Sequence, residues 1–141
     1  MEAQLAANAY AAVAKSTAPP KALEYQVFAR ATRDLTAAAS APKEDFPKTV
    51  QALHNNLRLW TLLAADVAME SNGLPADLRS KIVYLAQYTR AHTAKTMRGE
   101  ASIKPLIEIN TAVMRGLRAR PGANDDARAN EAAAPVAADA S

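Results

Sequence analysis

Hydrophobic side chains along this chain recur at helical spacing. Within residues 46–71 they follow one another in alternate steps of four and three positions, and the series is Phe46, Val50, Leu53, Leu57, Trp60, Ala64 and Val67. Steps of four and three place side chains on one face of a helix, whereas side chains on one face of a strand recur at every second residue. The spacing therefore predicts a long helix over residues 46–71, with an apolar seam suited to packing in a bundle.

Four other segments have helical patterns, over about residues 3–15, 20–38, 75–98 and 102–118. Pro19-Pro20, the loop at residues 40–47, Asn72-Gly73 and Gly99 separate them, and proline and glycine are common at helix boundaries. β-Branched runs are rare, and Ala, Leu, Arg and Lys dominate, which favours helix. The predicted fold class is all-α: a single-domain bundle of four to five helices with short loops.

The C-terminal segment has a different composition. Residues 119–141 contain one large apolar side chain, Val136, among alanines and acidic residues. Such a segment cannot bury enough apolar surface to offset the entropy lost on ordering. We therefore expect a helical domain over residues 1–118, followed by a disordered, Ala-rich, acidic tail over residues 119–141.

The helix predicted over residues 46–71 has more apolar side chains than its seam requires. Leu59, Leu62, Leu63 and Met69 lie outside that seam. At about 100° per residue, Leu62 projects about 140–160° away from Leu57 and Ala64. Either this helix is central in the bundle, or it offers a second apolar face to a partner. The sequence leaves both interpretations open.

Several polar residues fall among apolar positions. Asn110 lies in the middle of the apolar stripe of residues 102–118, and Asn56 lies one turn before Trp60. Each is either a buried amide that fixes helix register or a contact to a partner. His92 lies on the apolar arc of residues 75–98, where we expect a hydrogen-bonded histidine in the core or at its boundary, the alternative being a ligand or a switch. Glu24 falls among the apolar positions of residues 20–38 and would need a basic partner if it were buried.

No arrangement of residues indicates catalysis. The chain has no cysteine, which excludes thiol nucleophiles, disulfides and thiolate metal sites, and its two histidines lie on different predicted helices. The four glycines are scattered and form no phosphate-binding loop. We predict a protein that is not an enzyme and has neither metal nor cofactor. No apolar stretch approaches the roughly 18 residues of a membrane span, so we expect no membrane insertion.

Positive charge is concentrated in one segment. The net charge is +3, and five basic residues but no acidic residue lie between Leu78 and Gly99, namely Arg79, Lys81, Arg90, Lys95 and Arg98. They are either a solvated helix face or a surface for RNA. We expect no exposed aromatic residue interleaved among them, which makes RNA binding the weaker interpretation.

Three motifs in series resemble the FlaF family of flagellar biosynthesis regulators of alphaproteobacteria. They are N-x-x-x-W at residues 56–60, N-x-L-P-x-x-L-R at residues 72–79, and L-I-x-I-N-x-x-x-M-x-G-L at residues 106–117. The resemblance runs from about residue 9 to residue 117 in the same order and spacing. It departs from the family pattern at Lys21, where the family usually has arginine, and the tail has no counterpart in it.

The resemblance implies a cytoplasmic, non-enzymatic protein that is needed for flagellin production. Members of this family are described as positive factors for flagellin synthesis that act opposite the regulator FlbT, and as secretion chaperones that bind flagellin. The expected partners are therefore flagellin and FlbT.

Our hypothesis is that an apolar groove between the third and fifth helices binds an amphipathic segment of unassembled flagellin. The expected partner-binding residues are Asn56, Leu59, Trp60, Leu62, Leu63, Ile109, Asn110, Val113 and Met114. The runner-up hypothesis is post-transcriptional regulation, in which the basic side of residues 75–98 contacts flagellin messenger RNA. A third is a structural adaptor at the flagellar base.

Overall fold

The computed structural model describes residues 2–14, 24–41, 43–69 and 75–118, without the side chains of residues 10–14. In these residues the elements are α1 (Glu2–Ala14), α2 (Tyr25–Ala39), the 3-10 turn η1 (Lys43–Asp45), α3 (Phe46–Ala68), α4 (Ala76–Met97) and α5 (Lys104–Arg118). The described part of the chain contains no strand. The predicted all-α bundle is confirmed, with five helices. The predicted tail at residues 119–141 lies outside the described residues. The helix predicted over residues 46–71 ends earlier, at Ala68, because Met69 is extended, and Asn72-Gly73 lies outside the described residues.

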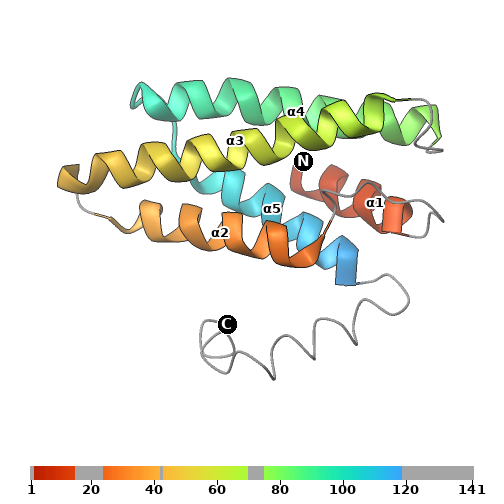
Figure 1. Ribbon diagram of the computed structural model, residues 1–141, viewed down its shortest axis with the longest axis horizontal. Helices are drawn as coiled ribbons and strands as arrows, with labels where there is room; N and C mark the ends of the chain where they lie inside the picture. The colour runs from red at the N-terminus through yellow and green to blue at the C-terminus, as the bar shows by residue number, and fades with distance from the viewer. Residues whose placement is uncertain (1, 15–23, 42, 70–74, 119–141) are drawn as a thin grey trace.

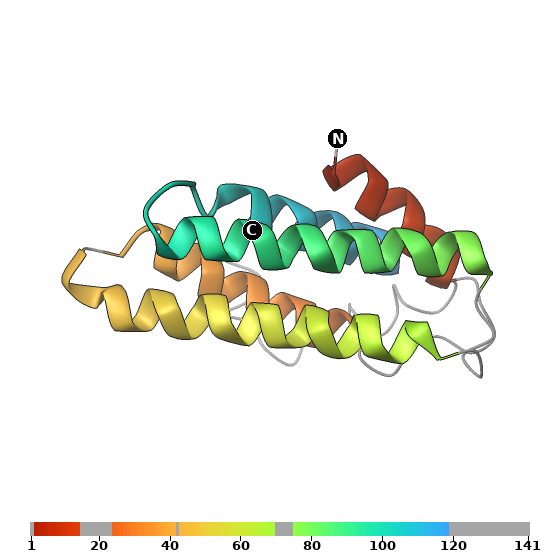
Figure 2. The same cartoon turned by 90° about the horizontal axis from the view of Figure 1, so that it is seen from above.

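The helices form a closed ring around the core. α2 packs against both α3 and α5, α4 packs against α3, and α1 packs against α5 and α4 (Figure 1). α3 and α5 therefore face each other across the core, with α2 on one side and with α4 and α1 on the other. Figure 2 shows α1 beside the half of α4 that begins at Ala76. At this end of the bundle, α1 fills the space between α4 and α5.

Buried side chains form two clusters. The larger one draws on all five helices, and its largest members are Phe28, Leu59, Trp60, Leu63, Ile82, Leu85, Ile109, Val113 and Leu117. The smaller one lies near the α2–α3 and α4–α5 connections and contains Leu35, Ala52, Leu53, Ile103 and Leu106. Phe28 meets Trp60 edge-on, with ring centroids 5.7 Å apart and an interplanar angle of 84°. The single tryptophan is thus at the centre of the larger cluster.

The buried face of α3 differs from the predicted seam. Phe46, the first residue of that seam, is 51% exposed, and Leu57 and Ala64 are only half-buried. Leu59 and Leu63, which were expected outside the seam, are buried. A straight α-helix has 3.6 residues per turn, so a seam with a period of 3.5 drifts around it over several turns. Most of the apparent surplus on this helix is therefore used inside the bundle, which makes α3 a central helix along much of its length.

The connection between α4 and α5 is fixed at Gly99. Its φ of 76° is the left-handed conformation that side chains disfavour. Gly99 N–H donates to the Thr96 carbonyl (3.0 Å) and Glu100 N–H donates to the Lys95 carbonyl (2.9 Å), the two bonds of a Schellman motif. The predicted end of this helix at Gly99 is confirmed.

His92 and Glu24 have different outcomes. His92 Nε2 lies 2.6 Å from the Ser102 carbonyl oxygen, and its ring stacks on that of Tyr88, so the expected hydrogen-bonded histidine at the core edge is confirmed. The expectation of a buried, paired Glu24 is wrong. The helix begins at Tyr25, and Glu24 precedes it in an extended conformation with its side chain exposed.

Candidate functional site

A network of hydrogen bonds between buried polar side chains joins α3 to α5. The indole Nε1–H of Trp60 donates to Asn110 Oδ1 at 3.0 Å, and Asn110 Nδ2 donates to Asn56 Oδ1 at 2.8 Å. All three residues are fully buried. Because an indole nitrogen is only a donor, it requires the oxygen of Asn110 to face it, and that orientation turns the Asn110 amide nitrogen toward Asn56. The direction of every bond therefore follows from Trp60.

These bonds agree with the interpretation of Asn110 and Asn56 as buried amides, and contact with a partner is not tested. The two amides are buried side chains that hold α3 and α5 in one register, because a shift of either helix would break the bonds. Asn56 Nδ2 has no hydrogen-bond partner within the described residues. A buried amide nitrogen without an acceptor lowers the stability of the fold, so this atom is the least favourable part of the hydrogen-bonded network.

The nine predicted partner-binding residues do not line an open groove. Seven are buried inside the monomer: Asn56, Leu59, Trp60, Leu63, Ile109, Asn110 and Val113. Met114 is half-buried, and only Leu62 is exposed, at 55%. The open groove expected between the third and fifth helices is closed, because α2 covers one side of it and α4 with α1 cover the other. The structure nevertheless brings five of them into one apolar cluster, with Met114 packed against it: Leu59, Trp60, Leu63, Ile109 and Val113. Their contact with a partner stays a prediction.

α1 covers this cluster through small side chains. Ala6 and Ala9 are its two fully buried residues within 2–9 and belong to the larger cluster, together with Ala112 of α5. Gly116 lies one turn after Ala112 and is also buried. Alanine and glycine let two helix backbones approach closely, which explains why α1 packs more extensively against α5 than against α4. The spacing of these small residues is the sequence signal for this packing, and large apolar residues alone do not reveal it.

A hydrogen bond ties the start of α1 to α4. Tyr84 donates its hydroxyl to Glu2 Oε2 at 2.9 Å. This bond, followed by partial desolvation and the negative charge of Glu2, raises the pKa of Tyr84 above its ordinary value. Tyr84 is 44% exposed, so the tie lies at the rim of the bundle and is open to solvent.

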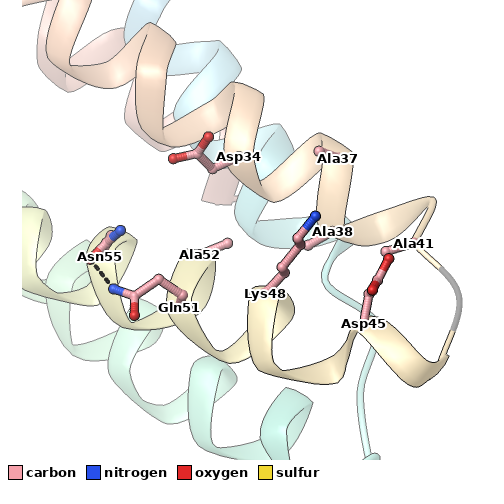
Figure 3. A pocket seen from close by; sticks show the side chains of 9 residues that line it. All are labelled: Asp34, Ala37, Ala38, Ala41, Asp45, Lys48, Gln51, Ala52 and Asn55. Carbon is pink, nitrogen blue, oxygen red and sulfur yellow. Dashed lines mark hydrogen bonds between the residues drawn. The ribbon is translucent and has the colours of Figure 1, made fainter.

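A cleft of about 470 Å³ lies between the end of α2 and the start of α3 (Figure 3). Its lining combines a floor of small residues with a polar rim, namely Asp34, Ala37, Ala38, Ala41, Asp45, Lys48, Gln51, Ala52 and Asn55. Gln51 Nε2 donates to Asn55 Oδ1 at 2.9 Å along the rim. None of the predicted partner-binding residues lines this cleft. Facing alanines on two helices leave such a gap, and this signal was also missed.

The face of α3 that lines this cleft continues toward exposed apolar residues. Leu62 follows Asn55 by seven positions and Met69 follows Leu62 by seven, so the three lie close to one line on the helix surface. Leu62 and Met69 are 55% and 60% exposed. The exposed part of the apolar surplus predicted for this helix is therefore confined to these two side chains.

The basic residues of α4 do not form one surface. At about 100° per residue, Arg79 and Arg90 share a direction, whereas Lys81, Lys95 and Arg98 point elsewhere around the helix. Lys81 pairs with Asp77 (3.2 Å) and Arg98 pairs with Glu100 (2.8 Å). Both carboxylates lie just outside residues 78–99. Tyr84 lies between Lys81 and Arg90 and is 44% exposed, so the expectation of no exposed aromatic residue among them is wrong. Dispersed and partly paired cations give less support to RNA binding than their number in the sequence suggested.

The described residues offer neither a metal site nor a membrane-spanning helix. No group of three His, Asp or Glu side chains gathers there to hold a metal ion. None of the described helices has the length and apolarity needed to cross a membrane.

Comparison with known proteins supports the resemblance seen in the three motifs. No curated protein and no solved structure gives a significant match to the chain. A family model described as flagellar protein FlaF matches residues 6–117, which include α2, α3, α4 and α5 and most of α1. Because the match spans most of the sequence, the chain belongs to the FlaF family of flagellar proteins.

Proposed function

We propose that this FlaF-family chain binds unassembled flagellin as a secretion chaperone and acts as a positive regulator of flagellin synthesis. The observation that carries the proposal is the apolar cluster between α3 and α5. α1 covers one side of this cluster, and Ala6 and Ala9 are its fully buried residues there. A bundle that already packs a helix into a gap between two others has the geometry for helix-in-groove recognition. An amphipathic segment of flagellin is the client that fits this geometry.

Chaperone binding and regulation are compatible in one protein. A chaperone that holds free flagellin senses how much of it awaits export, because each bound client removes one free chaperone. The regulator FlbT is the expected partner for passing that information to flagellin synthesis.

The direct test is co-purification of the full chain with flagellin alone. We expect a stable complex, and truncation of flagellin from each end should identify the segment that is bound. Absence of a complex with flagellin, together with capture of a protein of the flagellar base, would replace the chaperone by a structural adaptor.

A salt titration distinguishes the chaperone from the RNA hypothesis. Binding to an apolar groove should change little between low and moderate salt, whereas binding to RNA should weaken by orders of magnitude. A complex with flagellin messenger RNA that shows this steep dependence, and no complex with flagellin, would contradict the proposal.

A further inference from the structure

α1 differs from the other helices in what it contributes to the core. Its fully buried side chains within residues 2–9 are Ala6 and Ala9, each of which adds one methyl group. The other helices contribute Trp60, Leu63 and Val113 to the same cluster. In this region α1 therefore shields large apolar side chains mainly with alanines, and Leu5 is its one large apolar side chain that packs, half-buried, against the cluster.

The start of α1 lies beside an open cleft. This cleft of about 400 Å³ lies between the first half of α4 and Ala68 at the end of α3, and its lining includes Val83 and Tyr84. The Tyr84 hydroxyl also donates a hydrogen bond to Glu2, and Val83 packs against the larger cluster. The hydrogen bond at the start of α1 is thus next to an open hollow, and solvent reaches it directly.

A helix of this length has little stability without packing. α1 has 13 residues, and isolated helices shorter than about 12–15 residues are marginal in water. Its place in the bundle therefore depends on contacts with α4 and α5. The same groove would be unfavourable if left empty, because the apolar side chains of α4 and α5 that pack against α1 would become exposed.

We infer that the groove between α4 and α5 is the client-binding site, and that α1 occupies it in the free protein as an internal substitute for the client helix. This inference rests on the proposed function and names the surface that flagellin binds. The client segment enters beside Tyr84, displaces α1, and covers the apolar cluster in its place. The buried residues predicted for partner binding then become accessible only as α1 leaves.

α1 also specifies the chemistry of the occupant. Glu2, Ala6 and Ala9 are separated by four and three positions, so they lie on one face of the helix. A competing helix needs a carboxylate that accepts a hydrogen bond from Tyr84, followed four and seven positions later by small residues that approach α5 closely. Bulky residues at these two positions would hold the helix away from Ala112 and Gly116.

Competition from α1 lowers the apparent affinity for the client. For a ligand that binds only the uncovered form, the apparent dissociation constant equals the intrinsic constant divided by the fraction of molecules that are uncovered. Fixing α1 in place must therefore weaken flagellin binding, and loosening α1 must strengthen it. These opposite effects distinguish displacement from binding elsewhere on the bundle.

The first experiment fixes α1. The chain has no cysteine, so Glu2→Cys with Tyr84→Cys in the full-length protein creates the one pair that a short bismaleimide can join. We expect the linked protein to bind flagellin at least about tenfold more weakly than the same variant with both thiols capped separately. The capped protein controls for the loss of the two native side chains.

The second experiment loosens α1 in the full chain. Ala9→Glu places a carboxylate at a fully buried position, which α1 cannot keep packed against α5. We expect flagellin binding to become about tenfold tighter. Asn8→Glu is the matched control, because Asn8 is exposed on the same helix and the change should leave binding unaltered. The linked protein keeps the inference testable if Ala9→Glu prevents folding.

The alternative location is the exposed side of α3. If linking α1 leaves flagellin binding unchanged while Leu62→Asp abolishes it, the client lies beside α2 and α3, and the inference is overturned while the proposed function stands. If the wild-type and capped proteins both fail to bind flagellin, the proposed function fails and the inference fails with it.

Discussion

Trp60 on α3 and Asn110 on α5 are joined across the core by a hydrogen bond of 3.0 Å from the indole Nε1–H to Oδ1. The two helices face each other, with the remaining helices closing the ring around them. This bond and the Asn110–Asn56 bond are directional contacts in a core otherwise held by nondirectional apolar packing. They therefore select one register of α3 against α5.

The first prediction concerns this bond. Asn110→Ala should lower the free energy of unfolding by about 2–4 kcal/mol, because it removes the acceptor of the buried Trp60 N–H and the donor to the buried Asn56 oxygen. Chemical denaturation followed by circular dichroism measures the change. The control is Thr111→Ala, since Thr111 is exposed and its hydroxyl bonds only to the Ile107 carbonyl of its own helix. Equal stability of the two variants would mean that the bond has no net stabilising effect.

A second prediction compares neighbouring leucines on α3. Leu63 is fully buried, whereas Leu62 is 55% exposed. Leu63→Ala should destabilise the fold by about 2–5 kcal/mol, and Leu62→Ala should change stability by about 0.5 kcal/mol or less. Thermal unfolding of both variants under the same conditions gives the comparison. A large loss at Leu62 would show that it is covered in solution.

Gly99 provides a third prediction, on backbone conformation. Its φ is 76°, and a Cβ atom added there would meet no atom within 4 Å. Gly99→Ala should therefore cost about 1 kcal/mol through conformation alone, without a steric clash. Gly99→Asn should cost less, because asparagine tolerates the left-handed region better than alanine does. If both variants are as stable as wild type, the turn has a different conformation in solution.

The hydrogen bond between Tyr84 and Glu2 gives a prediction about pH. Because this bond raises the pKa of Tyr84 in the folded state, its stabilisation is fully present below the ordinary pKa of tyrosine and is lost as pH rises through the raised value. Glu2→Ala should let Tyr84 ionise at lower pH. Tyrosinate absorbance during an alkaline titration measures this, and Tyr84→Phe identifies which part of the signal belongs to Tyr84. An unchanged titration after Glu2→Ala would show that the bond does not form in solution.

The sequence predicted the elements of the fold better than the surface that they leave open. The spacing of large apolar residues and the position of Gly99 are local signals, and both led to the correct helices. Asn110 was recognisable because an amide in an apolar stripe requires a partner. Its bonds to Trp60 and Asn56 depend on how α3 and α5 face each other, which no local pattern contains.

The predicted groove failed for a related reason. Leu59 and Leu63 appeared to exceed the needs of one seam, but a helix with neighbours on several sides buries more than one stripe. The alanines of α1 and the small residues of α5 have weak hydrophobic signals, although they determine how closely the two helices pack. The packing of α1 over the larger cluster could therefore not be predicted from the large side chains alone.

The position of α1 has a consequence for the order in which the bundle is completed during translation. Residues 15–103, 89 in all, separate the end of α1 from the start of α5, its most extensive packing partner. A ribosome releases α1 first and α5 last, so this contact forms only when the whole domain has been synthesised. Until then α5 is missing from the nascent bundle, and α1 lacks its main packing partner.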